Sequence, residues 1–340
     1  MKERRQFLTF VWLMATLTLT GAVLAQAPPP RAERVYVTNF DTDFITVIDA
    51  VNHKKLADIR TGKKPHGVAV SADGKYVYVS NEGENSVSVI DAGSLAVSAT
   101  IQVGARPNQL CLSGDGKIVY VPNNGDASVS VIDTARNQVV ATVPVGRNPH
   151  IAYALPDGKF IYVTSEGDSK ISIIEHFSRT VVGEIGLFGF PRVPASSPGG
   201  RWFYLTLRWL HGFLVIEPQA RKVVNSIDLG SPIFATDGKT AHGLGVSPGG
   251  KAIYLTSQVF NNVFVIDAET LKVVRSIPVG VDPNWIGFTG DGRFAFVSNT
   301  ASNDVSVIDT GAGRVIQAIP VGKSPKRLAV GPAPTPGRRE

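Results

Sequence analysis

The dominant pattern in this chain is a block of alternating apolar and polar residues that repeats at an almost constant interval. An aromatic residue marks the same place in each block, at Tyr36, Tyr78, Tyr120, Tyr162, Tyr204, Tyr254 and Phe296. Successive markers are 42 residues apart, except for one interval of 50 residues between the fifth and the sixth. A period in this range indicates one repeated structural unit rather than several different domains.

Each repeat is predicted to contain four short β-strands. In the second repeat, residues 76–80, 86–90, 96–103 and 109–113 have the composition of strands, and the first two runs alternate with a period of two. The Asp115-Gly116 pair predicts a tight hairpin with positive φ at both central residues. An acidic residue follows the second strand of each repeat, and we expect it to accept hydrogen bonds from nearby backbone N–H groups.

Seven such units predict an all-β fold, a seven-bladed β-propeller of four-stranded blades. The chain enters the pattern on a second strand, at residues 34–38, and leaves it after a first strand, at residues 326–330. Pairing the C-terminal strand with the N-terminal strands would close the ring and remove its open edges. We therefore expect residues 34–330 to form one propeller, with a linker at 28–33 and a flexible tail at 331–340.

The first 27 residues differ from the repeats. The sequence RRQFL at positions 4–8 begins an apolar run that ends at residue 24, and small residues follow it. This order is typical of a secretory signal and matches the twin-arginine export signal. An ordinary secretory signal and an uncleaved membrane anchor are the alternatives. We expect a periplasmic or secreted protein that contacts a membrane only if the signal is retained.

Charge and cysteine content narrow the possible partners. The formal net charge is +6, and the export signal supplies +2 of it through three basic residues and one acidic residue. The remaining basic residues are scattered among the repeats, so nucleic acid is not expected as a partner. The single cysteine, Cys111, excludes an intramolecular disulfide and is expected to be a small buried apolar residue.

The residues YVTN at 36–39, VIDA at 47–50 and YVYVSN at 76–81 resemble the YVTN family of β-propeller repeats. The resemblance covers about residues 34–330 and implies the propeller fold. Proteins similar to this family include surface-layer and periplasmic binding proteins. More distant propellers include lactonases and the haem-d1 and copper-bearing domains of nitrogen-oxide reductases, so the resemblance does not select an activity.

The loops before the inner strands should meet at one mouth of the central channel. The residue just before each inner strand is polar or basic in all seven repeats: His66, Asn108, His150, Arg192, His242, Asn284 and Lys326. Such a ring would attract anions. Its histidines (His66, His150 and His242) are candidate ligands for copper or zinc. The alternative is that they are solvated loop residues or partners of loop carbonyls.

The pattern is interrupted in the fourth to sixth repeats. Eight extra residues precede His242, and a loop that is polar elsewhere becomes LRWLHG at 207–212. Aromatic and basic residues together suit a protein partner or a small ligand with apolar and anionic parts. The alternative is that they pack an enlarged loop onto the rim. The candidate ligand-binding residues are Arg192, Trp209, His211, Phe234, His242 and Trp285.

Motifs of catalysis are missing from the sequence. It contains no GxSxG, no P-loop and no CxxCH haem attachment, so we name no catalytic residue. We therefore expect an exported, monomeric binding or interaction module whose site lies at the channel mouth over the fourth to sixth repeats. The alternative is a metal- or cofactor-bearing redox propeller or a lactonase-like enzyme.

Overall fold

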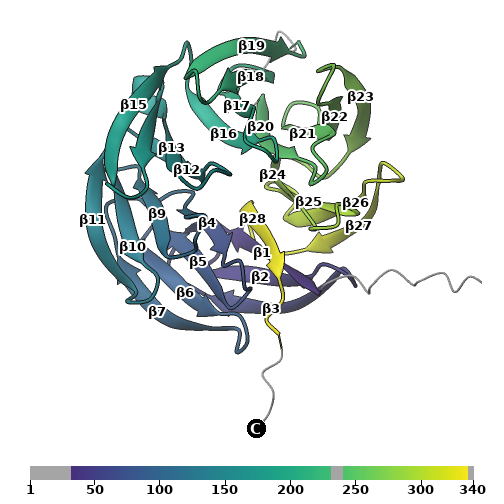
Figure 1. Cartoon of the computed structure of the whole chain (residues 1–340). Helices are drawn as coiled ribbons and strands as arrows, with labels where there is room; N and C mark the ends of the chain where they lie inside the picture. Colours follow the sequence, from purple (N-terminus) through teal and green to yellow (C-terminus); the bar gives the residue numbers. More distant parts are fainter. Residues whose placement is uncertain (1–31, 231–239, 336–340) are drawn as a thin grey trace, which may run out of the picture. The chain divides into compact units, whose positions relative to one another are not determined.

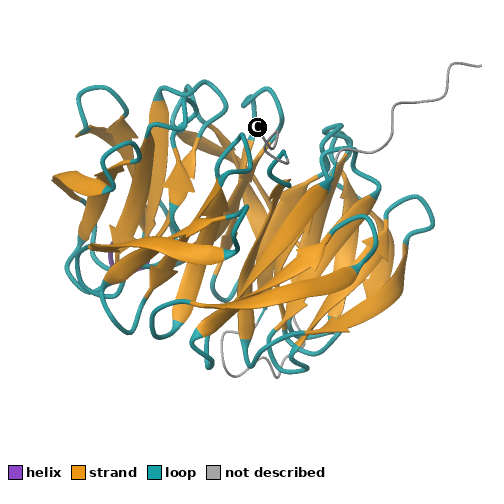
Figure 2. Ribbon diagram, turned by 90° about the horizontal axis from the view of Figure 1, so that it is seen from below, coloured by secondary structure: helices purple, strands orange, loops and turns teal. Residues whose placement is uncertain are grey.

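In the computed structural model, which describes residues 32–230 and 240–335, seven antiparallel sheets of four strands each form a ring (Figure 1). The strands run between two faces of loops (Figure 2). The predicted all-β, seven-bladed propeller is thus confirmed. Within the described part of the chain, no helix is long and apolar enough to cross a membrane. The predicted export signal lies outside the described residues.

The strands of each blade are given from the channel outward. The first three blades consist of β4 (Pro65–Val70), β5 (Tyr76–Asn81), β6 (Ser86–Asp91) and β7 (Ala96–Gln102); β8 (Cys111–Leu112), β9 (Ile118–Asn123), β10 (Ser128–Asp133) and β11 (Gln138–Pro144); and β12 (Pro149–Ala154), β13 (Phe160–Ser165), β14 (Lys170–Glu175) and β15 (Thr180–Gly186). A 3-10 helix, η1 (Glu166–Asp168), joins β13 to β14. The next three blades consist of β16 (Pro191–Ser196), β17 (Phe203–Leu207), β18 (Gly212–Glu217) and β19 (Lys222–Asp228); β20 (Ala241–Val246), β21 (Ala252–Ser257), β22 (Asn262–Asp267) and β23 (Val273–Pro278); and β24 (Pro283–Phe288), β25 (Phe294–Asn299), β26 (Asp304–Asp309) and β27 (Arg314–Pro320).

The seventh blade joins the two ends of the propeller. It consists of β28 (Pro325–Pro332), β1 (Glu33–Asn39), β2 (Phe44–Asp49) and β3 (Lys54–Arg60). β28 pairs antiparallel with β1, and Val330 lies opposite Val35 in the register. The closure predicted from the order of strands is therefore confirmed, and the ring has no open edge between its first and last strands.

The repeated aromatic residue lies in the second strand of each blade and is buried. Tyr36 is fully buried, and the equivalent residues of the other six repeats are at most 5% exposed. The core is divided into clusters that span neighbouring blades; Tyr36 and Val47, for example, pack against Val68 and Val79 of the next blade. Because neighbouring blades cover both faces of each sheet, both alternating sets of side chains are buried in the two middle strands, and the 42-residue period reports this packing.

The turns agree only in part with those predicted from the sequence. The Asp49 carboxylate accepts hydrogen bonds from the N–H groups of Val51 (2.8 Å) and Asn52 (2.9 Å), so the acidic residue after the second strand has the structural role expected of it. The predicted positive φ at both residues of the Asp115-Gly116 pair is wrong, because only the glycine (φ 71°) adopts it. Asp115 instead accepts a hydrogen bond from Ser113, which fixes the turn from its side chain.

One inner strand is shorter than predicted. The run at 109–113 forms only β8, because Gln109 directs its backbone toward the next blade. Its N–H donates to the carbonyl of His150 (3.1 Å), and its carbonyl accepts from the N–H of Ala152 (3.0 Å). Cys111 is half-buried and packs in the core, and burial raises the pKa of its thiol to about 12.

Candidate functional site

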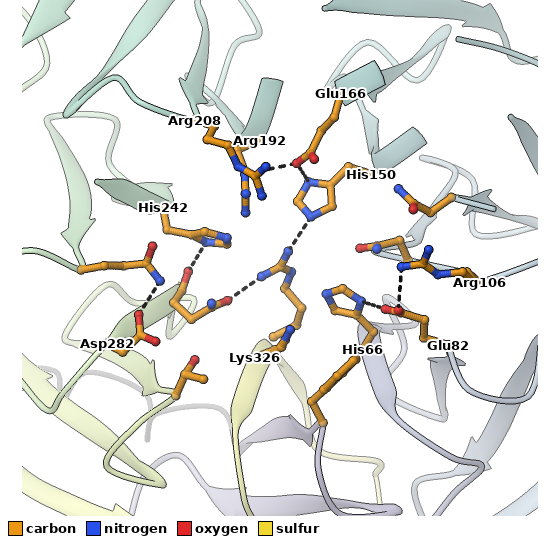
Figure 3. A pocket seen from close by; sticks show the side chains of 17 residues that line it. His66, Glu82, Arg106, His150, Glu166, Arg192, Arg208, His242, Asp282 and Lys326 are labelled. Atoms are coloured by element: carbon orange, nitrogen blue, oxygen red, sulfur yellow. Dashed lines mark hydrogen bonds and ion pairs between the residues drawn. The ribbon is translucent and has the colours of Figure 1, made fainter. Parts of the chain in front are cut away.

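A polar cavity of about 420 Å³ lies at the mouth of the central channel (Figure 3). All seven members of the predicted ring line it: His66, Asn108, His150, Arg192, His242, Asn284 and Lys326. A second set of residues, from the loops between the second and third strands of the blades, forms most of the remaining wall: Phe40, Glu82, Asn124, Glu166, Arg208, Gln258 and Thr300. The structure therefore brings these two types of loop together on one face. Every blade contributes to the cavity, not only the fourth to sixth.

Arg327 of β28 bridges the channel. Its Nη1 donates to Asn284 Oδ1 of β24 at 2.5 Å, and its Nη2 donates to Nε2 of His150, in β12, at 3.1 Å. The side chain is 1% exposed and stacks on the ring of Trp285 at 4.6 Å. Its Nε has no hydrogen-bond partner among the described residues. Burial, with repulsion from Arg192, lowers the pKa of Arg327 to about 9, so the group remains charged at neutral pH.

The carboxylates of the cavity pair with groups other than Arg327. Glu82 binds His66 Nδ1 at 2.7 Å and Arg106 at 3.4 Å, whereas Glu166 lies 3.2 Å from Arg192. No described carboxylate lies within 4.0 Å of the Arg327 guanidinium. A buried charge is normally paired, because leaving water without a partner is costly. The geometry therefore presents a buried cation at the channel mouth that forms no direct ion pair with any described carboxylate.

The lining as a whole is positive. Among the described lining residues there are five cations (Arg106, Arg192, Arg208, Lys326 and Arg327) and three carboxylates (Glu82, Glu166 and Asp282). The histidines add no charge at neutral pH, because burial lowers the pKa of His66 to about 4. It also holds the pKa values of His150 and His242 well below their usual range, and the nearby Arg327 reinforces this. A formal excess of two positive charges remains to attract an anion.

The three ring histidines do not fit a zinc or copper site. The rings of His66 and His150 are 6.4 Å apart between centroids, and Nε2 of His150 is already occupied by Arg327. Within residues 32–230 and 240–335, no group of three or more His, Cys, Asp or Glu side chains could hold a metal ion. The Arg327 charge would also repel a cation at this position.

The other predicted ligand-binding residues are dispersed. Arg192 and His242 line the cavity, and Trp285 supports Arg327 through its ring face. Trp209 is 53% exposed in the β17–β18 loop and does not line the cavity. His211 is buried away from the cavity, where it bonds to the Gly230 carbonyl (2.6 Å) and to the Ser257 hydroxyl (2.9 Å). Phe234 lies outside the described residues.

Sequence reasoning missed Arg327, although the repeat contains a signal for it. Arg327 is one position after the ring residue Lys326, where the other six repeats have Gly67, Gln109, Ile151, Val193, Gly243 and Trp285. Most of these are small or apolar, as is expected of a buried inner-strand position. A single arginine in that column departs from the pattern of the repeat, and a comparison of the repeats at this position would have identified it.

Comparison with known proteins identifies related propellers. A family model described as a YNCE-like beta-propeller matches residues 68–159 and 232–332. No curated protein matches the chain in sequence.

Among solved structures, hydrazine synthase from Kuenenia stuttgartiensis is 24% identical, with a TM-score of 0.73 over 86% of this chain and 99% of that chain. The periplasmic gluconolactonase PpgL of Pseudomonas aeruginosa is 20% identical, with a TM-score of 0.73 over 89% and 100%. Dihydro-heme d1 dehydrogenase NirN is 18% identical, with a TM-score of 0.64 over 90% and 78%. At these identities the likeness shows the fold, and the chemistry differs among the three.

Proposed function

We propose that this chain, which belongs to the YNCE-like β-propeller family because that family's model matches more than half of its residues, is an exported protein that binds a small hydrophilic anion at its channel mouth. The observation that supports this is Arg327, a buried cation without a carboxylate partner among the described residues. A bound anion would supply the missing counter-charge. The polar lining favours a hydrophilic ligand over an apolar one.

The arrangement of the groups also supports binding at this position. Arg327 is held by two neutral acceptors, Asn284 and His150, which orient the guanidinium without neutralising it. Lys326 lies beside it and stacks over the Phe40 ring at 4.0 Å. Two cations fixed in place before binding lose little conformational freedom when an anion arrives, and this raises affinity.

The test is calorimetric titration of the protein with phosphate, sulfate and succinate at low ionic strength. We expect at least one of them to bind in 1:1 stoichiometry. Replacing Arg327 with methionine should lower that affinity about 10- to 100-fold, the usual effect of losing a charged hydrogen-bonding group. Arg60→Met, on the exposed outer strand β3, is the matched control and should change nothing. If no anion binds, or if Arg327→Met binds as the wild type does, the proposal is wrong.

One observation favours an enzyme as the second candidate. A carboxylate that holds an imidazole, as Glu82 holds His66 at 2.7 Å, is the arrangement of a general base for hydrolysis, including lactone hydrolysis. A base works best when its pKa lies near the working pH, whereas the pKa of His66 is about 4. We therefore place binding first. Lactone-hydrolysis assays of wild type and His66→Gln decide between the two, since only an enzyme would lose turnover.

Export forms a separate part of the proposal and rests on the RRQFL sequence at positions 4–8. Residues 1–33 fused to a reporter that folds in the cytoplasm should carry it to the periplasm. Changing Arg4 and Arg5 to lysine should stop transport, because the twin-arginine pathway reads both residues. Continued export of that variant would instead indicate an ordinary secretory signal.

A further inference from the structure

The hydrogen bonds of the channel histidines determine which ring nitrogen carries the proton. The Glu82 carboxylate only accepts hydrogen bonds, so Nδ1 of His66 is the donor across their 2.7 Å contact. The backbone carbonyl of Asn284 likewise accepts from Nδ1 of His242 at 2.8 Å. In both rings the proton is on Nδ1, and Nε2 therefore carries a lone pair.

The two Nε2 atoms are open to the cavity. Neither makes a hydrogen bond with any described residue, and neither is among the buried polar atoms that lack a partner. Both residues line the cavity, and Figure 3 shows His66 and His242 on different sides of it. Both rings also stay neutral at neutral pH, as described above, so each Nε2 is a fixed hydrogen-bond acceptor.

His150 has a different role from His66 and His242. Its Nε2 accepts a hydrogen bond from Arg327 and serves to orient the cation. The channel mouth thus offers two kinds of recognition at once. Arg327 and Lys326 offer positive charge, while His66 and His242 offer acceptors that only an O–H or N–H donor can satisfy.

We propose that the ligand is a small hydroxylated acid, whose acid group binds to Arg327 and Lys326 and whose hydroxyl groups donate to Nε2 of His66 and His242. This inference rests on the proposed anion site and adds the class of ligand. Hydroxyl donors fit better than ammonium donors, because the formal charge of the lining is already positive and would repel a second cation. An acid without hydroxyl groups would displace water from both Nε2 atoms and leave them without partners.

The experiment compares glucarate with adipate, six-carbon dicarboxylates of equal charge that differ in four hydroxyl groups. We expect calorimetry to show glucarate binding about 100-fold more tightly, since a site built to bond hydroxyl groups rejects the analogue that lacks them. His66→Phe should lower the affinity for glucarate about 10-fold and leave that for adipate unchanged, because it removes one acceptor. His53→Asn changes a histidine outside the cavity lining and should leave both affinities unchanged.

The outcomes separate this inference from the proposed function. If glucarate and adipate bind equally and both depend on Arg327, the hydroxyl recognition is wrong and the anion site stands. If neither acid binds, and phosphate, sulfate and succinate do not bind either, both proposals are wrong. The comparison of the two acids uses the wild-type protein, so it is decisive even if His66→Phe does not fold.

Discussion

Asn81 and Arg327 are both buried polar side chains, yet they differ in whether their hydrogen bonds are complete. Asn81 donates to Ser86 and Ser88 of the neighbouring strand and accepts from the N–H of Gly62, so its amide is satisfied on both sides. Among the described residues, Nε of Arg327 has no hydrogen-bond partner, and no carboxylate lies within ion-pair distance of the guanidinium.

The contrast distinguishes a structural polar group from a functional one. A satisfied buried network stabilises the fold and has nothing left to offer a ligand. An unsatisfied buried charge lowers stability, and it persists where a ligand completes it. Burial alone would not have separated the two sites, because Asn81 is 0% exposed and Arg327 1% exposed.

The largest effect on stability is expected for the satisfied site. Replacing Asn81 with alanine leaves the Gly62 N–H without its acceptor and removes two bonds to serine hydroxyls. We expect the free energy of unfolding to fall by about 2–4 kcal/mol. Denaturant unfolding measures this. The stabilisation given by a bound anion should remain, and its loss would mean that the two sites are coupled.

Replacing Arg327 should give the opposite result, with no loss of stability. In anion-free buffer, Arg327→Met should be no less stable than the wild type, because it removes a buried charge that has no ion-pair partner among the described residues. At an anion concentration 100 times the wild-type dissociation constant, the wild type should gain about 2.7 kcal/mol of stability, and the variant, which binds 10- to 100-fold more weakly, only about 0.4–1.4 kcal/mol. Thermal unfolding with and without the anion provides the comparison. Equal gains in both proteins would contradict the anion site.

Lowering the pH should also affect the two regions differently, because the channel contains titratable groups. The pKa of His66 is about 4 in the folded state, against about 6.5 in an unfolded chain. The unfolded state therefore binds more protons between these values, and stability is lost as the pH falls from 6.5 towards 4. His66 should contribute about 1 kcal/mol to the stability lost between pH 6 and pH 5. His66→Gln should therefore lose about that much less than the wild type, and the loss that remains is expected from His150 and His242, whose pKa values are also lowered by burial. If the wild type and His66→Gln lose the same amount of stability between pH 6 and pH 5, the pKa of His66 is not lowered in the folded state.

Much of the fold could be predicted from the sequence, because a repeat reports its packing seven times. The spacing from Tyr36 to Phe296 predicted the blades, and the polar or basic residue that recurs near the start of each inner strand predicted the wall of the cavity. In six of the seven blades the structure places this residue second in the inner strand, and not before it. The closure by β28 followed from the strand on which the chain begins. In each case the information lies in regularity along the chain.

The site itself depends on distances across the ring, which regularity does not encode. Arg327 contacts His150 177 residues earlier in the chain, and it meets Asn284 from another blade. His211 looked like a ligand-binding residue because it replaces a polar loop residue, but it bonds to Gly230 and Ser257 away from the cavity. A departure from the repeat marks a special position, and only the contacts show whether it is special for packing or for binding.

The smallest effect is expected at Trp209, and it tests whether the exposed aromatics of the fourth to sixth repeats belong to the anion site. Trp209 has a φ of 74°, so asparagine, which tolerates this conformation, is the suitable replacement. Because the side chain is 53% exposed and does not line the cavity, Trp209→Asn should change the free energy of unfolding by less than about 0.5 kcal/mol and leave anion affinity within about twofold. Calorimetric titration of Trp209→Asn and Arg327→Met with the same anion compares the two affinities directly. A tenfold loss of affinity would extend the ligand-binding site from the channel mouth to the exposed aromatic residues of the fourth to sixth repeats.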